Sequence, residues 1–260
     1  MGGISVTVLG SGVAWANPGG VCSGYLVRAA GAALLMDCGT GTLGRLRAVL
    51  DPARLNGIVV SHMHPDHFMD LVGLRYGIRY GGLGGAAPLP VFVPPGGIEY
   101  LARLGQVLDS DVQFFSDVFD LREYNPAGRL TFGTMTVQMR RVQHYIPSHS
   151  MRIEAGRSHS LVYSADAAPC DALVEHARGA DTLLCEAAML HHGQDEREPE
   201  KRGHLTAGEA GMIAQQAGVR RLLLTHAPLE LDDPGRAARE AAQEFGGVIE
   251  RVVDGETYLI

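Results

Sequence analysis

The sequence predicts an α+β fold in which two mixed β-sheets pack against each other and helices cover their outer faces. Two observations support this prediction. Both halves of the chain contain patterns typical of strands and of helices, and β-meander stretches occur beside strand–helix alternation. The chain has 260 residues, of which 46% are apolar, and this is enough for a sizeable core. We therefore expect residues 1–260 to form one domain made of two similar halves.

In the first half, alternating apolar and small polar residues at 4–9 predict a strand, which a Gly-rich loop follows. Further strands are expected at residues 24–28, 32–37, 55–61 and 91–93. Helical patterns occupy residues 43–50, 66–79 and 98–108.

The second half repeats this rhythm. Strands are expected as two segments within 130–141, then at 160–164, 182–185 and 221–225, with two short strands near the end of the chain. Helices are expected at residues 169–178, 206–216 and 234–245.

Composition and charge exclude several functional classes. The net charge is −7 and no block of Lys and Arg stands out, so a nucleic acid is not the expected substrate. The chain lacks an 18-residue apolar run and a basic leader, which predicts a cytoplasmic protein that does not enter a membrane. The four cysteines are scattered along apolar stretches, and we expect them to be reduced, buried thiols: Cys22, Cys38, Cys170 and Cys185.

The segment His62-Met63-His64-Pro65-Asp66-His67 carries four potential metal ligands in one turn. Imidazoles this close together disfavour each other's protonation, and a bound cation removes that penalty. The turn follows the apolar stretch 55–61, so the ligands begin where a predicted strand ends. This arrangement predicts a metal site.

Three later polar residues also end apolar runs, as ligands do when a sheet edge presents them to a shared opening. They are His144, Asp166 and His226. With the first turn they supply enough nitrogen and carboxylate ligands for two metal ions. Two such cations would lower the pKa of a shared water enough to supply hydroxide at neutral pH.

This ordered set resembles the metallo-β-lactamase fold superfamily along the whole chain. The resemblance implies an αβ/βα sandwich and two divalent metal ions, with zinc expected and manganese or iron as alternatives. It assigns His62, His64, His144 and Asp166 to one metal. It assigns Asp66, His67, Asp166 and His226 to the other, so that Asp166 bridges the pair.

Two further segments resemble the phosphodiesterase branch of this superfamily, which includes tRNA 3′-processing endonucleases. One is Gly203-His204-Leu205-Thr206, in which Thr206 is a candidate helix N-cap and His204 is expected to protonate the leaving oxygen or to steady the phosphate. The other is Leu184-Cys185-Glu186, in which Glu186 is expected to orient His204. The candidate catalytic residues are therefore Asp66, His204 and Glu186.

The tRNA-processing enzymes carry a long basic arm between the positions matching His144 and Asp166, where this chain has only a compact stretch. A small phosphodiester is therefore the expected substrate. Several motifs, including Tyr163-Ser164-Ala165-Asp166, are similar to bacterial atypical, class II-like cyclic-nucleotide phosphodiesterases. The resemblance implies hydrolysis of cyclic AMP to AMP by a metal-held hydroxide, and a homodimer. The alternatives are a tRNA 3′-endonuclease, a lactone or thioester hydrolase, and a non-catalytic metal-binding protein.

Other residues carry weaker expectations. Trp15 is expected to line the mouth of the site, where it can stack on a purine. Asp37 is expected just behind the metals, Tyr25 in the core, and His149 in a solvated loop. The remaining histidines are expected at the surface: His159, His176, His191 and His192.

Overall fold

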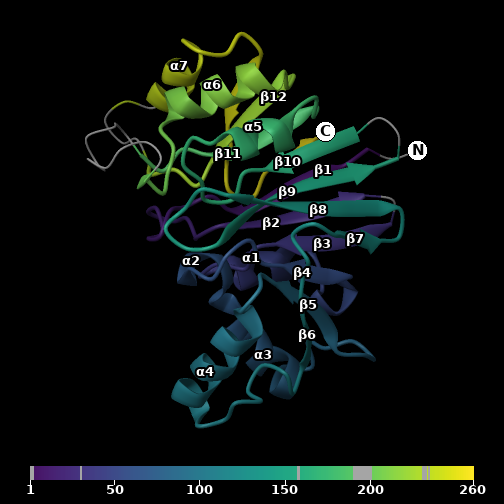
Figure 1. Cartoon of the computed structure of the whole chain (residues 1–260). Coiled ribbons are helices and arrows are strands. Elements are labelled where there is room, and N and C mark those ends of the chain that lie inside the picture. The colour runs from purple at the N-terminus through teal and green to yellow at the C-terminus, as the bar shows by residue number, and fades with distance from the viewer. Residues whose placement is uncertain (1–2, 30, 157–158, 190–200, 230–232, 234) are drawn as a thin grey trace.

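A computed structural model describes residues 3–29, 31–156, 159–189, 201–229, 233 and 235–260. Its strands form two seven-stranded mixed sheets that pack face to face, with helices on the outer sides (Figure 1). The predicted α+β sandwich is therefore confirmed. Among the helices of the described residues, none combines the length and the apolar character needed to cross a membrane.

The first sheet joins the two ends of the chain. Its order is β14 (Thr257–Leu259), β1 (Ser5–Gly10), β2 (Gly24–Ala29), β3 (Ala32–Met36), β4 (Gly57–Val59), β5 (Leu89–Val93) and β6 (Phe119–Glu123). Pairing is antiparallel from β14 to β3 and parallel from β3 to β6.

The second sheet has the same division. Its order is β13 (Val248–Arg251), β12 (Arg221–Thr225), β11 (Thr182–Glu186), β10 (His159–Tyr163), β9 (Ser148–Ala155), β8 (Met135–Val142) and β7 (Arg129–Phe132). Pairing is parallel from β13 to β10 and antiparallel from β10 to β7. The two halves are thus built alike, as the sequence predicted.

The helices divide between the outer faces of the two sheets (Figure 1). Beside the first sheet lie α1 (Thr42–Val49), the 3-10 turn η1 (Pro52–Arg54), α2 (Pro65–Phe68), α3 (Asp70–Gly81) and α4 (Gly97–Asp109). Beside the second sheet lie α5 (Asp171–Ala177), α6 (Ala207–Ala217) and α7 (Arg236–Ala241). Buried apolar residues fill three layers, one between the sheets and one under each group of helices.

The start of α6 is fixed by a capping box, which matters because His204 lies just before it. The Thr206 hydroxyl accepts a hydrogen bond from the backbone N–H of Glu209, and the Glu209 carboxylate accepts one from the backbone N–H of Thr206. Two N–H groups that the helix leaves unpaired are satisfied in this way. The predicted N-cap role of Thr206 is confirmed.

The structure corrects the expectation for residues 148–155. These residues form β9, and His149 is a buried strand residue with 2% exposure instead of a solvated loop residue. The His149 ring lies between the sheets, 5.3 Å from the ring of Tyr124, and the polar side chains on the other face of β9 meet α5 instead of water. Arg152, for example, donates to the backbone carbonyls of His176 and Arg178.

The burial of His176 also differs from the expectation. It was expected at the surface, but it is 8% exposed and its Nδ1 lies 3.1 Å from the Ser150 hydroxyl of β9. His159 is partly exposed, and His191 and His192 lie outside the described residues. Strand β6 was not predicted, and the helix expected at 66–79 is divided into α2 and α3 at Met69.

Candidate metal centre

The turn that follows β4 places the first ligands. Pro65 begins α2, where its fixed φ suits the first helical position and its missing N–H is not needed. The hydroxyl of Tyr124, the residue after β6, lies 3.1 Å from the backbone carbonyls of Val60 and Ser61 and supports the chain immediately before the ligands. The turn is therefore held in place from behind before any ligand side chain is considered.

One group of side chains brings together His62, His64, His144 and Asp166. The His64 Nδ1 atom lies 3.1 Å from His62 Nε2 and 3.0 Å from His144 Nε2. The Asp166 Oδ2 atom lies 3.6 Å from His62 Nε2. The four candidate ligand atoms all lie within 4.8 Å of one another.

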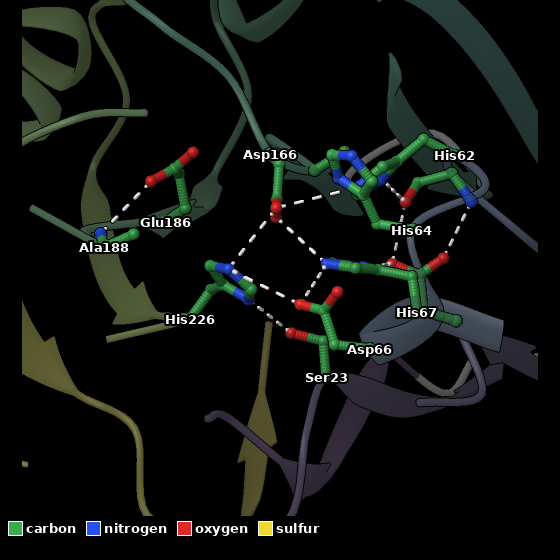
Figure 2. Close-up of polar contacts among 12 residues, drawn as sticks. Ser23, His62, His64, Asp66, His67, Asp166, Glu186, Ala188 and His226 are labelled. Atoms are coloured by element: carbon green, nitrogen blue, oxygen red, sulfur yellow. Dashed lines mark hydrogen bonds and ion pairs between the residues drawn. The ribbon is translucent and has the colours of Figure 1, made fainter. Parts of the chain in front are cut away.

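A second group brings together Asp66, His67, Asp166 and His226 (Figure 2). His67 Nε2 lies 3.2 Å from Asp166 Oδ1 and 3.3 Å from Asp66 Oδ2. His226 Nε2 lies 3.3 Å from Asp166 Oδ2. Figure 2 shows the Asp166 carboxylate between His62, His67 and His226, so this one residue belongs to both groups.

The outer nitrogens of four imidazoles are engaged by fixed partners. His67 Nδ1 donates to Asp37 Oδ2 at 2.7 Å, and His144 Nδ1 donates to the Gly203 carbonyl at 2.6 Å. His62 Nδ1 lies 3.0 Å from Ser61 Oγ, whose own proton goes to Asp37, and His226 Nδ1 lies 2.8 Å from Ser23 Oγ. This pattern leaves the Nε2 lone pairs directed inward, as metal-binding imidazoles require.

The residues present fit divalent metal ions. His67 Nε2 and Asp166 Oδ1 are buried atoms without a hydrogen-bond partner among the described residues, which is costly unless a cation contacts them. Burial lowers the pKa of His62, His144 and His226, so their rings are neutral donors. For His67 burial is outweighed by the carboxylates of Asp166 and Asp37, which raise its pKa; a metal on Nε2 would replace that proton.

Asp37 lies behind the site at the end of β3, as the sequence predicted. Its two oxygens accept from the Ser61 N–H at 2.7 Å, the Ser61 hydroxyl at 2.8 Å, the Tyr163 hydroxyl at 2.9 Å and His67. Tyr163 comes from β10, so this one carboxylate links the two sheets directly behind the metal-binding groups.

Backbone strain is concentrated at the same place. Asp37, Ala165 and His226 have φ angles of 56°, 56° and 42°, in the left-handed region that side chains with a Cβ rarely adopt. Each follows the end of a strand, β3, β10 or β12. His226 is itself a candidate ligand, and Ala165 directly precedes the candidate ligand Asp166. Among the described residues the only other non-glycine case is Ser110. Strain of this kind persists where the surrounding structure holds a functional geometry.

His204 and Glu186 are in the contact that the sequence predicted. His204 Nδ1 lies 2.9 Å from Glu186 Oε1, and Glu186 is fully buried. The Glu186 carboxylate also accepts from the backbone N–H groups of Ala167, Ala188 and Leu205. Burial alone would lower the pKa of His204, but the adjacent Glu186 carboxylate raises it to about 9. The His204 ring also lies beside Asp166, with Nδ1 3.9 Å from Asp166 Oδ2.

A cavity of about 380 Å³ opens over both groups. Trp15 lines it, as predicted, whereas Tyr25 is fully buried between the sheets. Tyr145 also lines the cavity and was missed, although it directly follows the candidate ligand His144. The described residues around the cavity are Val13, Ala14, Trp15, His64, Pro65, Asp66, Tyr145, Asp166, Ala188, Met189, His204 and His226.

The fold and the paired His/Asp groups, which are capable of holding metal ions, define a metal-dependent hydrolase. A family model described as the beta-lactamase superfamily domain matches residues 33–227, and the chain belongs to this family.

Proteins from several bacteria are similar to this chain over most of its length. An uncharacterized protein of Mycobacterium tuberculosis is 37% identical over 260 residues, which cover 99% of this chain and 92% of that protein. The probable metallo-hydrolase YhfI of Bacillus subtilis is 31% identical over 86% of this chain and 87% of its own length. The crystal structure of YhfI superposes with a TM-score of 0.84 over 98% of this chain and 99% of that one. A ribonuclease Z of Mycobacterium bovis is 29% identical over 95% of each chain.

Proposed function

We propose that this protein is a phosphodiesterase with two metal ions that hydrolyses a small phosphodiester, and that its substrate is a 3′,5′-cyclic nucleotide. The single observation that carries the proposal is the position of His204. Its ring borders the same cavity as both ligand groups and is held there by the buried Glu186. A proton donor placed beside a pair of metal-binding groups is what cleavage of an alkyl phosphodiester requires.

The two groups of side chains have separate roles in this proposal. His62, His64, His144 and Asp166 hold one metal, and Asp66, His67, Asp166 and His226 hold the other. Metals bound there lower the pKa of a bound water and neutralise the charge of the phosphate. Zinc, manganese and iron all accept this set of imidazole and carboxylate ligands.

His204 acts on the leaving group. When the bond between phosphorus and the 3′ oxygen breaks, the ribose oxygen must gain a proton, because an alkoxide is a poor leaving group. His204 supplies that proton, and Glu186 holds the ring and stabilises its charged form. Asp66 belongs to the second metal group and lines the cavity.

The volume of the cavity and the net charge of the chain favour a small substrate. The cavity of about 380 Å³ lies within the range of roughly 300–1,000 Å³ that small-molecule sites occupy. The net charge of −7 opposes the binding of a long phosphate backbone. The similarity to ribonuclease Z supports phosphodiester chemistry, and it keeps cleavage of precursor tRNA as the second candidate.

The test is a substrate panel run on metal-loaded protein whose metal content is measured by elemental analysis. We expect conversion of a cyclic nucleotide to its 5′-monophosphate, which is measured by chromatography. The panel includes bis(p-nitrophenyl) phosphate, a precursor tRNA, a lactone and a thioester. Failure on every phosphodiester by protein that holds about two metals per chain would refute the proposal, and turnover of the lactone or thioester would replace it. Cleavage of the tRNA alone would establish the second candidate.

A further inference from the structure

Two exposed aromatic side chains lie at the border of the cavity over the ligand groups. Trp15, between β1 and β2, is 65% exposed, and Tyr145, which follows β8, is 46% exposed. A single exposed aromatic residue on a protein surface needs no explanation. Two of them at the edge of one cavity, which also contains the candidate metal ligands, indicate a surface that contacts a ligand.

Tyr145 is held in this position by its surroundings. Its ring centroid lies 5.1 Å from that of His144 and 5.6 Å from that of His204. The ring also lies against Gly203, where an added Cβ would be 2.4–2.6 Å from three ring atoms. Only glycine at 203 leaves room for the ring, so the backbone beside His204 is shaped to receive Tyr145.

The lining of the cavity contains two chemically different kinds of residue. The ligand side chains and His204 are polar, and Val13, Trp15, Tyr145 and Met189 are apolar or aromatic. A nucleotide has the same division, because a charged phosphate is joined through a sugar to a flat base with an apolar face.

We propose that Trp15 and Tyr145 form the base-binding subsite of this cavity, in which the nucleobase stacks on their rings. The inference rests on the proposed function, because that function places the phosphate end of the nucleotide at the metal-binding groups. Tyr145 and Trp15 are then specificity-determining residues, whereas the metal groups and His204 contact the part that all phosphodiesters share.

The chain contains its own probe for this subsite, because Trp15 is its only tryptophan. Metal-loaded protein is titrated with AMP, the expected product, while tryptophan fluorescence is recorded. We expect saturable quenching by AMP and none by ribose 5-phosphate, which lacks the base. The Tyr145→Ala variant is expected to bind AMP about tenfold more weakly, in line with the loss of one stacking partner. Tyr80→Ala, which removes an equally large ring that is 74% exposed on α3 and outside the cavity, is the matched control.

Steady-state kinetics provide a second readout. Trp15→Ala and Tyr145→Ala are expected to raise the KM for a cyclic nucleotide about tenfold and to change kcat by less than threefold. The inference is overturned if AMP leaves the fluorescence unchanged, or if Tyr145→Ala alters neither the quenching nor KM.

The two proposals can fail separately. If the protein hydrolyses no cyclic nucleotide but AMP still quenches Trp15 in a Tyr145-dependent manner, the base subsite stands and the proposed reaction does not. If cyclic nucleotides are hydrolysed and both aromatic variants bind and react as the wild type does, the reaction stands and the base subsite is rejected.

Discussion

Asp37 and His67 are joined by a hydrogen bond of 2.7 Å, and neither side chain is exposed. Asp37 Oδ2 also accepts from the Ser61 and Tyr163 hydroxyls, and Oδ1 accepts from the Ser61 N–H. Both oxygens are therefore occupied by donors. This arrangement keeps the proton of His67 on Nδ1 and directs Nε2 toward Asp66 and Asp166.

The Asp37→Asn variant tests this relationship. In one orientation the amide NH₂ replaces Oδ2, the acceptor of His67, and in the other it replaces Oδ1 and faces the Ser61 N–H, so each orientation sets a donor against a donor and removes the negative charge beside His67. We expect metal affinity to fall about 10–100-fold, the usual effect of removing a group that orients a metal ligand. Competition with a chromophoric chelator measures it. Asp120→Asn, at a more exposed carboxylate on β6, is the control, and an unchanged affinity of Asp37→Asn would contradict the role given to Asp37.

Metal content should respond differently to two ligand variants. Asp166 belongs to both groups, so we expect Asp166→Ala to lose both ions. His226 belongs to one, and His226→Ala should retain about one ion per chain. Elemental analysis after loading and gel filtration distinguishes these results. Equal metal content in the two variants would show that Asp166 does not bridge the sites.

Removal of metal should also destabilise the fold. Ligands that bind only the native state stabilise it by about 2.7 kcal/mol per site when their free concentration is 100 times Kd. We therefore expect a chelator to lower the urea midpoint of the wild type, and to have almost no effect on Asp166→Ala. A midpoint of the wild type that does not move on chelation would argue against native-state metal binding.

The contribution of His204 should depend on the leaving group. For a cyclic nucleotide the leaving oxygen needs a proton, and we expect His204→Ala to lower kcat by about 10²–10⁴. For bis(p-nitrophenyl) phosphate, whose leaving group is stable as an anion, the loss should be less than tenfold. His159→Ala removes a histidine at the start of β10 and serves as the control. Equal losses for both substrates would mean that His204 does not protonate the leaving group.

His176 gives a prediction for stability against pH. Burial, together with Arg140 and Arg152, lowers its pKa from 6.5 to about 4, so the folded protein holds this ring neutral. Between pH 6.5 and 4 the unfolded chain binds more protons at this position, and the free energy of unfolding therefore falls as pH falls. The total decrease in the free energy of unfolding from this residue is about 3 kcal/mol.

The measurement compares urea unfolding of the wild type and His176→Gln at pH 7 and pH 4. Glutamine can still contact the Ser150 hydroxyl but does not titrate. The wild type should lose about 3 kcal/mol more than the variant over this interval, while the histidines of the metal centre affect both proteins equally. Parallel pH profiles would show that His176 is not buried as described.

Much of the site was predictable because its residues end apolar runs. The strands before His62, Asp166 and His226 are nearly uniform in hydrophobicity, so the polar residue at each end stands out. The residues missed are those whose surroundings depend on packing between distant segments. His176 is buried because β9 passes beneath α5, and Tyr145 reaches the cavity because Gly203 leaves space for its ring. Neither fact has a local signal in the sequence.

The ligands of the proposed metal pair come from both sheets. Its first four are synthesised by position 67, but the second group is complete only when His226 has been added and β12 has joined its neighbours. A nascent chain therefore cannot assemble both metal-binding groups until His226 has left the ribosome. A polypeptide that ends before position 226 therefore lacks one ligand of the second group, and the complete pair of sites forms only with the full set of strands.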